Sequence, residues 1–287
     1  MTIRALALFC PLFQIELLKL LCHNLNDGEF TMSSENETTQ GNNEFDLDAV
    51  FDAENYLYFY GKSRMDESAE KEIKFLIEKV NIQKEMKILD LACGHGRHSN
   101  KFAEMGFDIT GFDINQDFLN IARTDATEKR LNVEFIHGDM RTLEFEEEFH
   151  RILLIFTAFG YFSDSENKLI LMNIYKALKK NGLFCFDVQN RDYLIKALQP
   201  FGILEKDGNY MLESRSFDIL TGRINTKRTY IKDNRTSVAN ISLREYSYTE
   251  LKIILDSVGF KIKDVYGSWN ADEFSKDSPR MIIIAEK

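Results

Sequence analysis

The sequence predicts an α/β protein, with a mostly parallel sheet covered by helices on both faces and a small antiparallel β insertion. Two observations predict this class. From residue 66 onward, apolar runs of strand length alternate with segments of helical periodicity, which is the order of a doubly wound sheet. The alternation stops at residues 207–247, where short runs separated by turn signals indicate a three-stranded antiparallel meander, and then resumes.

A helix is expected first, at residues 66–82, because its apolar side chains share one face and its first turn is acidic. Strands are expected after it at residues 87–91, 107–112, 133–136, 151–156, 183–188, 261–266 and 281–285. The intervening helices are expected at residues 97–104, from the N-cap Asn115, at 165–182 with Gly182 as C-cap, and at 249–257 with Gly259 as C-cap. These elements give a seven-stranded sheet.

The composition limits the classes of function. With 287 residues and 44% hydrophobic content, the chain can form one complete α/β domain and an accessory part. Its formal charge of −10 argues against a nucleic-acid binder that works by broad phosphate neutralisation. The four cysteines have spacings that match neither a zinc site nor a disulfide framework, so we expect no metal and a reducing, cytoplasmic compartment.

The chain divides into four parts. Residues 1–44 form a leader whose apolar run is interrupted before it could span a bilayer. We expect this leader to be disordered or dispensable, and whether residues 1–31 belong to the mature protein stays open. Residues 45–199 are expected to form the ligand-binding core, residues 200–247 the antiparallel insertion, and residues 248–287 the helix and two strands that complete the core.

A carboxylate and a small-residue turn follow the first expected strand. Asp90 stands at the end of this strand and precedes the turn "ACGHG" of residues 92–96. Glycines in such a turn let the backbone approach a ligand closely, and the following helix offers free N–H groups. Ligands of an open parallel sheet bind at the carboxyl ends of the strands, so this turn is a candidate cofactor site.

The next two strands end in carboxylates as well. Asp113 follows the second strand, at the expected place for a carboxylate that binds two ribose hydroxyls. Asp139 follows the third strand and can accept a hydrogen bond from an adenine amino group, with Met140 and Ile114 on the two faces of the ring. Each signal is weak by itself, but the ordered combination at three successive strand ends strongly indicates a nucleoside cofactor.

A nicotinamide cofactor is the rival interpretation. The dehydrogenase fingerprint has glycine or alanine as its third small residue, where this chain has Ser99. That fingerprint also leaves the preceding strand free of carboxylate, whereas Asp90 suits a cationic ligand. S-adenosylmethionine carries both a sulfonium and an amino group, so it is the expected cofactor.

These motifs resemble those of class I S-adenosylmethionine-dependent methyltransferases, from about residue 51 to residue 287. "LDLACGHGRHS", "GFDIN" and "GDMR" are similar to the first three motifs of the family, with Ala92 where many members have glycine. The resemblance implies a Rossmann-like sheet. The "ACG" variant, the "FGYF" stretch and the insertion after the fifth strand are similar to small-molecule methyltransferases, amino-sugar N-methyltransferases among them.

The resemblance implies cofactor-binding roles for one set of residues. Ala92 and Gly94 would line the methionine moiety, Asp113 the ribose, and Asp139 with Met140 the adenine. The full set is Tyr56, Arg64, Asp90, Ala92, Cys93, Gly94, Gly96, Asp113, Ile114, Asp139, Met140 and Ile155. Tyr58 and Tyr60 compete with Tyr56 for its role, and the aromatic stripe is equally typical of a helix packed on the sheet.

The acceptor side of the site is less defined. Tyr161, His95 and His98 are candidates for a general base, although most loop histidines are solvated or cap a helix. Candidate acceptor contacts are Phe159, Tyr161, Gln189, Asn190, Arg191 and Trp269. Asn190 and Arg191 could instead cap a helix, and Trp269 could cover the apolar face of the insertion. Methyl transfer needs mainly in-line positioning of the nucleophile, so the catalytic residues stay unassigned.

The expected function is methylation of a small polar metabolite, with the insertion as lid, acceptor site or dimer surface. Methylation of a protein or tRNA is the alternative enzyme, and a non-catalytic protein that binds the cofactor is the third. No nucleic-acid or membrane partner is expected. An anionic acceptor would suit the basic residues of the insertion and its approach, which are Arg191, Lys196, Lys206, Arg215, Arg223, Lys227, Arg228, Lys232 and Arg235.

Overall fold

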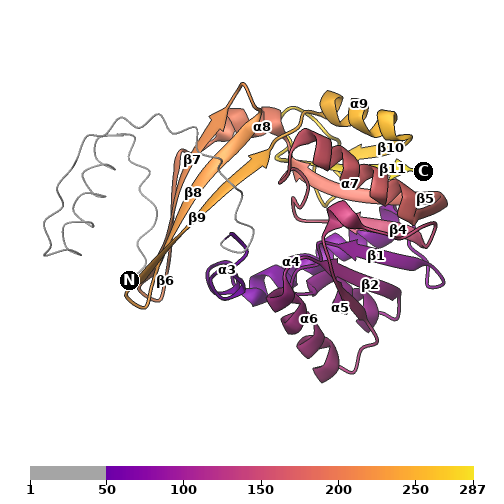
Figure 1. Ribbon diagram of the computed structural model, residues 1–287, viewed down its shortest axis with the longest axis horizontal. Coiled ribbons are helices and arrows are strands. Elements are labelled where there is room, and N and C mark those ends of the chain that lie inside the picture. The colour runs from indigo at the N-terminus through magenta and orange to yellow at the C-terminus, as the bar shows by residue number, and fades with distance from the viewer. Residues whose placement is uncertain (1–49) are drawn as a thin grey trace, which may run out of the picture. The chain divides into compact units, whose positions relative to one another are not determined.

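The structure, a computed structural model, describes residues 50–287 except the side chains of residues 62–68 (Figure 1). The expected leader at residues 1–44 therefore lies outside the described residues, and so does the side chain of Arg64. Among the described helices, none combines the length and the apolar character needed to cross a membrane.

Seven strands form the main sheet, and they confirm the predicted class. Their bounds are β1 (Lys87–Leu91), β2 (Asp108–Asp113), β3 (Glu134–His137), β4 (Phe149–Leu154), β5 (Leu178–Gln189), β10 (Lys261–Tyr266) and β11 (Arg280–Glu286). The order across the sheet is β10-β11-β5-β4-β1-β2-β3. Only β11 runs antiparallel to its neighbours β5 and β10, and the other pairs are parallel. Strand order reverses at β1 and β4, which places a ligand site at their carboxyl ends.

Helices cover both faces of this sheet. Their bounds are α3 (Ala53–Tyr60), α4 (Lys62–Lys79), α5 (Arg97–Glu104), α6 (Gln116–Glu128), η1 (Met140–Thr142), α7 (Asp164–Ala177), α8 (Arg191–Ala197) and α9 (Tyr248–Val258). Successive strand residues point to opposite faces, so Ile88 packs with the α4 and α5 side chains and Leu89 with those of α7 and α9. Both faces of the central strands are therefore buried, as their near-continuous apolar sequence requires.

Several predicted boundaries are wrong. The helix predicted at residues 66–82 runs instead from Lys62 to Lys79. Gly182 does not cap α7: the helix ends at Ala177, and the extended backbone of Leu178 begins β5 directly. The strand predicted to reach Phe156 ends at Leu154, because Phe156 and Thr157 have positive φ angles. The Phe156 N–H then donates to the Asp187 carboxylate at 2.5 Å, which satisfies this backbone group away from the sheet.

The insertion is a four-stranded antiparallel sheet and not a three-stranded meander. It comprises β6 (Phe201–Lys206), β7 (Asn209–Asp218), β8 (Arg223–Lys232) and β9 (Arg235–Arg244), in that order (Figure 1). The prediction missed β6. The inner face of this sheet packs on α3, where Phe59 stacks against Tyr230. A four-stranded sheet of this kind needs such packing, because an isolated hairpin or meander is marginally stable in water.

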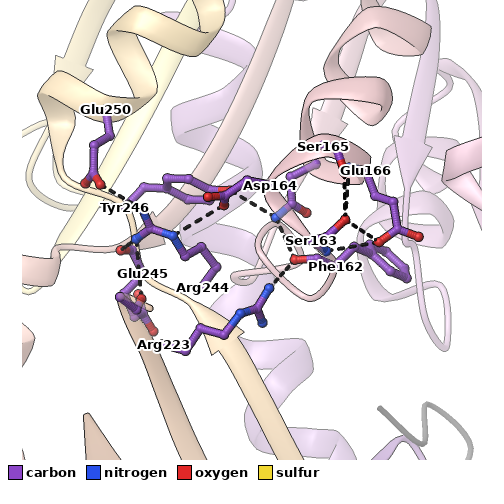
Figure 2. Close-up of polar contacts among 12 residues, drawn as sticks. Phe162, Ser163, Asp164, Ser165, Glu166, Arg223, Arg244, Glu245, Tyr246 and Glu250 are labelled. Carbon is purple, nitrogen blue, oxygen red and sulfur yellow. Dashed lines mark hydrogen bonds and ion pairs between the residues drawn. The ribbon is translucent and has the colours of Figure 1, made fainter. Parts of the chain in front are cut away.

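Polar contacts fasten the insertion to the core at the start of α7 (Figure 2). The Arg244 guanidinium contacts Asp164 at 3.3 Å and donates to Glu250 at 2.7 Å. Its backbone N–H donates to the Gly160 carbonyl at 2.9 Å. Arg223 donates to the Phe162 carbonyl from the neighbouring strand (Figure 2). The Arg244 side chain is nearly buried, so these charge-assisted bonds are little screened by water.

We expect Arg244→Met to lower the free energy of unfolding by about 2–4 kcal/mol, because it leaves carboxylates and carbonyls at this junction without their donor. Urea denaturation followed by circular dichroism measures the change. Arg235→Met is the matched control: Arg235 is exposed on the same strand, so its replacement should change the stability by less than about 0.5 kcal/mol. Equal effects of the two variants would contradict this account of the junction.

Candidate functional site

A cavity of about 910 Å³ opens at the carboxyl ends of the central strands. Its lining comes from the turn after β1, from residues following β2, β3 and β4, from α3, and from the inner face of β7, β8 and β9. This volume is at the upper end of the usual range for small-molecule sites. The cavity thus joins the strand ends, where the sequence predicts a cofactor, to the insertion.

The turn after β1 has the backbone that its sequence predicts. Ala92 and Gly94 both have a φ of 56°, and both line the cavity. A Cβ on Gly94 would meet nothing within 4 Å, so the space above this backbone is open. Gly96 does not line the cavity. It is the N-cap of α5, with a φ of 77°, and a Cβ there would come within 2.8 Å of the Ala122 Cβ.

Asp113 lies at the end of β2, faces the cavity and is only 7% exposed. Its Oδ2 accepts a hydrogen bond from the Gly94 N–H, and its Oδ1 accepts one from the Asn115 N–H, both at 2.7 Å. Burial raises the pKa of this carboxyl, and the two N–H groups oppose that shift. A carboxylate has about four acceptor positions, so the group retains acceptor capacity toward the cavity.

The other two strand-end carboxylates also line the cavity but have different environments. Asp90 is buried and accepts a hydrogen bond from the Ser99 hydroxyl at 2.6 Å, and burial raises its pKa. Asp139 is partly exposed and pairs with Arg141 at 2.7 Å. Burial raises the Asp139 pKa, but the hydrogen bonds and charge of Arg141 outweigh this effect and leave the pKa below its usual value.

These residues fit S-adenosylmethionine. The cavity combines an open, glycine-containing turn with three carboxylates at successive strand ends. Apolar side chains lie among them, as a purine ring requires: Phe112, Ile114, Met140 and Ile155. Cys93 lines the same wall, and burial raises the pKa of its thiol, so it remains an uncharged contact. Among the residues whose side chains the structure describes, each expected cofactor residue except Gly96 therefore borders one cavity.

The candidate general bases lie at the cavity, in settings that differ. Burial raises the pKa of Tyr161 to about 12, so its phenol stays protonated at neutral pH and is a hydrogen-bond donor. The His98 Nε2 lies 2.6 Å from the Glu72 carboxylate, which also pairs with Arg97 at 2.9 Å. His95 is buried beside Phe118.

Only some of the predicted acceptor residues border the cavity. Tyr161, Gln189 and Trp269 do. Phe159 is instead packed in the core between Phe186 and Tyr246.

Asn190 and Arg191 are also absent from the cavity wall. Asn190 caps α8 and donates to the Ser275 and Ser278 carbonyls, and Arg191 pairs with Glu250 at 2.6 Å. These contacts therefore support a structural role for both residues.

Trp269 does not cover the insertion. Its ring packs edge-on against Phe75 of α4, at 5.2 Å between ring centroids, on one face of the main sheet. The aromatic helix α3 contributes two residues to the cavity, Tyr56 and Tyr60, whose rings are 4.9 Å apart. Tyr58 points elsewhere and donates to the Lys206 carbonyl at 3.0 Å.

The sequence analysis placed Arg215 and Arg228 among the basic residues that would suit an anionic acceptor, but it missed the acidic residues Glu213 and Glu245. Glu213, Arg215 and Arg228 line the cavity from the inner face of β7 and β8. Alternation along the strands was a signal, because "LESR" places Glu213 and Arg215 two residues apart, and "TKR" does the same with Thr226 and Arg228, so each pair shares one face of the sheet. Gln189 donates to the buried Glu245 at 3.3 Å, a carboxyl that nothing in the sequence singled out.

Comparisons with known proteins show which proteins the chain is similar to. Residues 88–182 match the protein family described as "Methyltransferase domain". The chain is 24% identical over 226 residues to a glycine/sarcosine N-methyltransferase of Aphanothece halophytica, covering 75% of this chain and 81% of that protein. The names of the relatives differ in acceptor, so they define the reaction class and not the acceptor.

Solved structures share the fold. An S-adenosylmethionine-dependent methyltransferase from Clostridium acetobutylicum ATCC 824 superposes with a TM-score of 0.72 at 18% identity, covering 83% of this chain and 98% of that one. CalS10, an amino pentose methyltransferase from Micromonospora echinaspora solved with S-adenosylmethionine bound, gives a TM-score of 0.59 at 17% identity, covering 88% and 99%. The fold is thus that of class I methyltransferases, sugar N-methyltransferases included.

The fold and the motifs define the class of protein, an S-adenosylmethionine-dependent methyltransferase. Residues 88–182 form its methyltransferase domain as the family describes it. The cofactor is S-adenosylmethionine, as the strand-end carboxylates and the turn predict.

The Glu245 carboxyl should make the stability depend on pH. It is 1% exposed, and burial raises its pKa from 4.5 to about 8. The folded protein then keeps a proton that the unfolded chain releases, so the stability falls as the pH rises from about 4.5 to about 8. We expect Glu245→Gln to reduce the loss of stability between pH 6 and pH 8 by roughly 2 kcal/mol, measured by urea denaturation.

Glu134→Gln is the control for this experiment, because Glu134 is exposed at the start of β3. It should leave the pH dependence unchanged. An unaltered pH dependence in the Glu245 variant would show that this carboxyl titrates normally in the folded protein.

Proposed function

We propose that the protein transfers the methyl group of S-adenosylmethionine to a small polar metabolite bound in the cavity. One observation carries this proposal: a single cavity is bordered both by the strand-end residues Gly94, Asp113 and Asp139 and by the insertion residues Thr226 and Arg228. An acceptor held by the insertion side chains would therefore share one cavity with the cofactor. A volume of about 910 Å³ suits a cofactor and a small molecule together.

Different residues of this chain would bind the cofactor and orient the acceptor. Asp113 would accept hydrogen bonds from the ribose hydroxyls, and Asp139 one from the adenine amino group. When bound, S-adenosylmethionine supplies a methyl group that its sulfonium already activates. The remaining task is to position the acceptor atom and exclude water, which orientation by the protein can accomplish without an acid–base group. The protonated Tyr161 would orient the acceptor by donating a hydrogen bond.

The proposed function is tested with labelled S-adenosylmethionine and a cell extract separated into small metabolites, proteins and RNA. We expect label in the small-metabolite fraction. Label only in the protein or RNA fraction would support the alternative enzyme. Cofactor binding without transfer to any fraction would support the non-catalytic protein.

We expect Asp113→Ala to weaken binding of S-adenosylmethionine by about 1–3 kcal/mol, because the ribose loses a charged acceptor and the Gly94 turn loses its support. Isothermal titration calorimetry measures the dissociation constant. The control is Asp108→Ala, which removes a carboxylate from the exposed start of the same strand and should leave binding unchanged. Normal binding by the Asp113 variant would refute the assignment of Asp113 to the ribose.

We also expect replacement of residues 205–242 by a Gly/Ser linker to abolish transfer to the small-metabolite fraction while largely preserving cofactor binding. The deletion removes the insertion side of the cavity but keeps Arg244 and its contacts with the core. Transfer is measured with labelled cofactor, and binding by calorimetry. Full turnover by the deleted protein would exclude an acceptor role for the insertion.

A further inference from the structure

Three charged side chains form a cluster on the inner face of the insertion. Glu213 on β7 lies directly opposite Arg228 on β8, and Arg215 is two residues further along β7. The Glu213 carboxylate contacts Arg228 at 2.7 Å through Oε1 and Arg215 through Oε2. All three residues border the cavity, and Glu213 and Arg228 are almost completely buried.

This cluster carries an excess of one positive charge, since one carboxylate serves two guanidinium groups. Two other arginines of the cavity wall differ in this respect, because Arg97 pairs with Glu72 and Arg280 with Asp187. Glu213 and Arg228 are buried, and the Arg215 side chain is 28% exposed, so an excess charge on this partly buried cluster costs free energy unless an opposite charge compensates it. The wall formed by the insertion is therefore suited to an anion.

Hydroxyl groups beside the cluster add uncharged donors. The Arg228 Nη2 donates to the Tyr60 hydroxyl at 2.9 Å, so the Tyr60 oxygen accepts and its own proton stays available to a ligand. Burial raises the pKa of Tyr60, which keeps this proton in place at neutral pH. Thr226, opposite Arg215 on β8, also borders the cavity.

We propose that Glu213, Arg215 and Arg228, together with Tyr60 and Thr226, form a subsite for a carboxylate group of the methyl acceptor. This inference rests on the proposed function, since it names the chemical class of the acceptor. A carboxylate carries one negative charge and neutralises the cluster. A phosphate carries nearly two at neutral pH and would leave an excess negative charge, and a neutral group would leave the positive charge uncompensated.

The contributions of the core and the insertion to the cavity are consistent with this assignment. The three carboxylates at the strand ends belong to the core and suit the cationic cofactor. The excess positive charge belongs to the insertion and suits an anionic acceptor. Guanidinium groups bind planar carboxylates through paired hydrogen bonds, which would fix the orientation of the acceptor as well as its charge.

The test uses the full chain saturated with S-adenosylhomocysteine and three probes: acetate, its neutral analogue acetamide, and inorganic phosphate. Binding is followed by the ¹⁵N–¹H signals of the arginine side chains. We expect acetate to shift the Arg215 and Arg228 signals and to saturate, with phosphate and acetamide weaker. Arg215→Gln should raise the acetate dissociation constant at least about tenfold, and Tyr60→Phe about threefold.

The matched control is Lys227→Gln, which removes one positive charge from the opposite, exposed face of β8. It should leave acetate binding unchanged. The proposal is overturned if Lys227→Gln weakens acetate as much as Arg215→Gln does, if phosphate or acetamide binds as well as acetate, or if acetate shifts neither arginine. Failure of S-adenosylhomocysteine to bind would instead refute the proposed function, so the two failures are distinguishable.

Discussion

The carboxylate of Asp113 joins the ends of two strands, and most of the cavity depends on this contact. It accepts hydrogen bonds from the N–H groups of Gly94, in the turn after β1, and of Asn115, the N-cap of α6. The Asn115 side chain then caps α6 at Phe118 and donates to the Phe51 carbonyl. One buried carboxylate thus holds the turn, the following helix and the segment that leads into α3 in a fixed arrangement.

The cavity wall comes from two parts of the fold, the core and the insertion, and each part contributes charges of a different sign. Parallel strands end at the same edge of the sheet, so Asp90, Asp113 and Asp139 face one space although they are far apart in the sequence. The insertion brings Arg215 and Arg228 to the same space from strands that alternate inward and outward side chains. An acidic protein, with a formal charge of −10, therefore has a locally positive wall.

Among the described residues of the cavity wall, His95 and His98 are the candidate bases, whereas the phenol of Tyr161 is not one. Tyr161 has a pKa of about 12, and Glu245, which contacts the cavity residue Gln189 but does not line the cavity, has one of about 8, so both are mainly protonated at neutral pH. Such groups donate hydrogen bonds and do not remove protons. The arrangement suits a reaction whose main requirement is the position of the acceptor.

Local sequence was sufficient for the core of the fold. Strands β1 and β10 and helix α5 begin and end at the predicted residues, because apolar periodicity and glycine turns act over a few residues. The turn at Gly94 and the three strand-end aspartates follow from the same local signals, since the carboxyl ends of parallel strands necessarily meet. The match to the methyltransferase family, at residues 88–182, includes this turn and the three aspartates.

Tertiary structure decided the rest, because the deciding contacts join residues that are distant in the chain. Leu178 leaves α7 four residues before Gly182, since it pairs with Phe149 in β4. The Asn190 side-chain amide donates hydrogen bonds to the Ser275 and Ser278 carbonyls, and no local sequence pattern reveals these contacts. The sequence alone determined the cofactor turn and its carboxylates, whereas the pairing of β7 with β8 determined that two guanidinium groups share one carboxylate in the wall of the cavity.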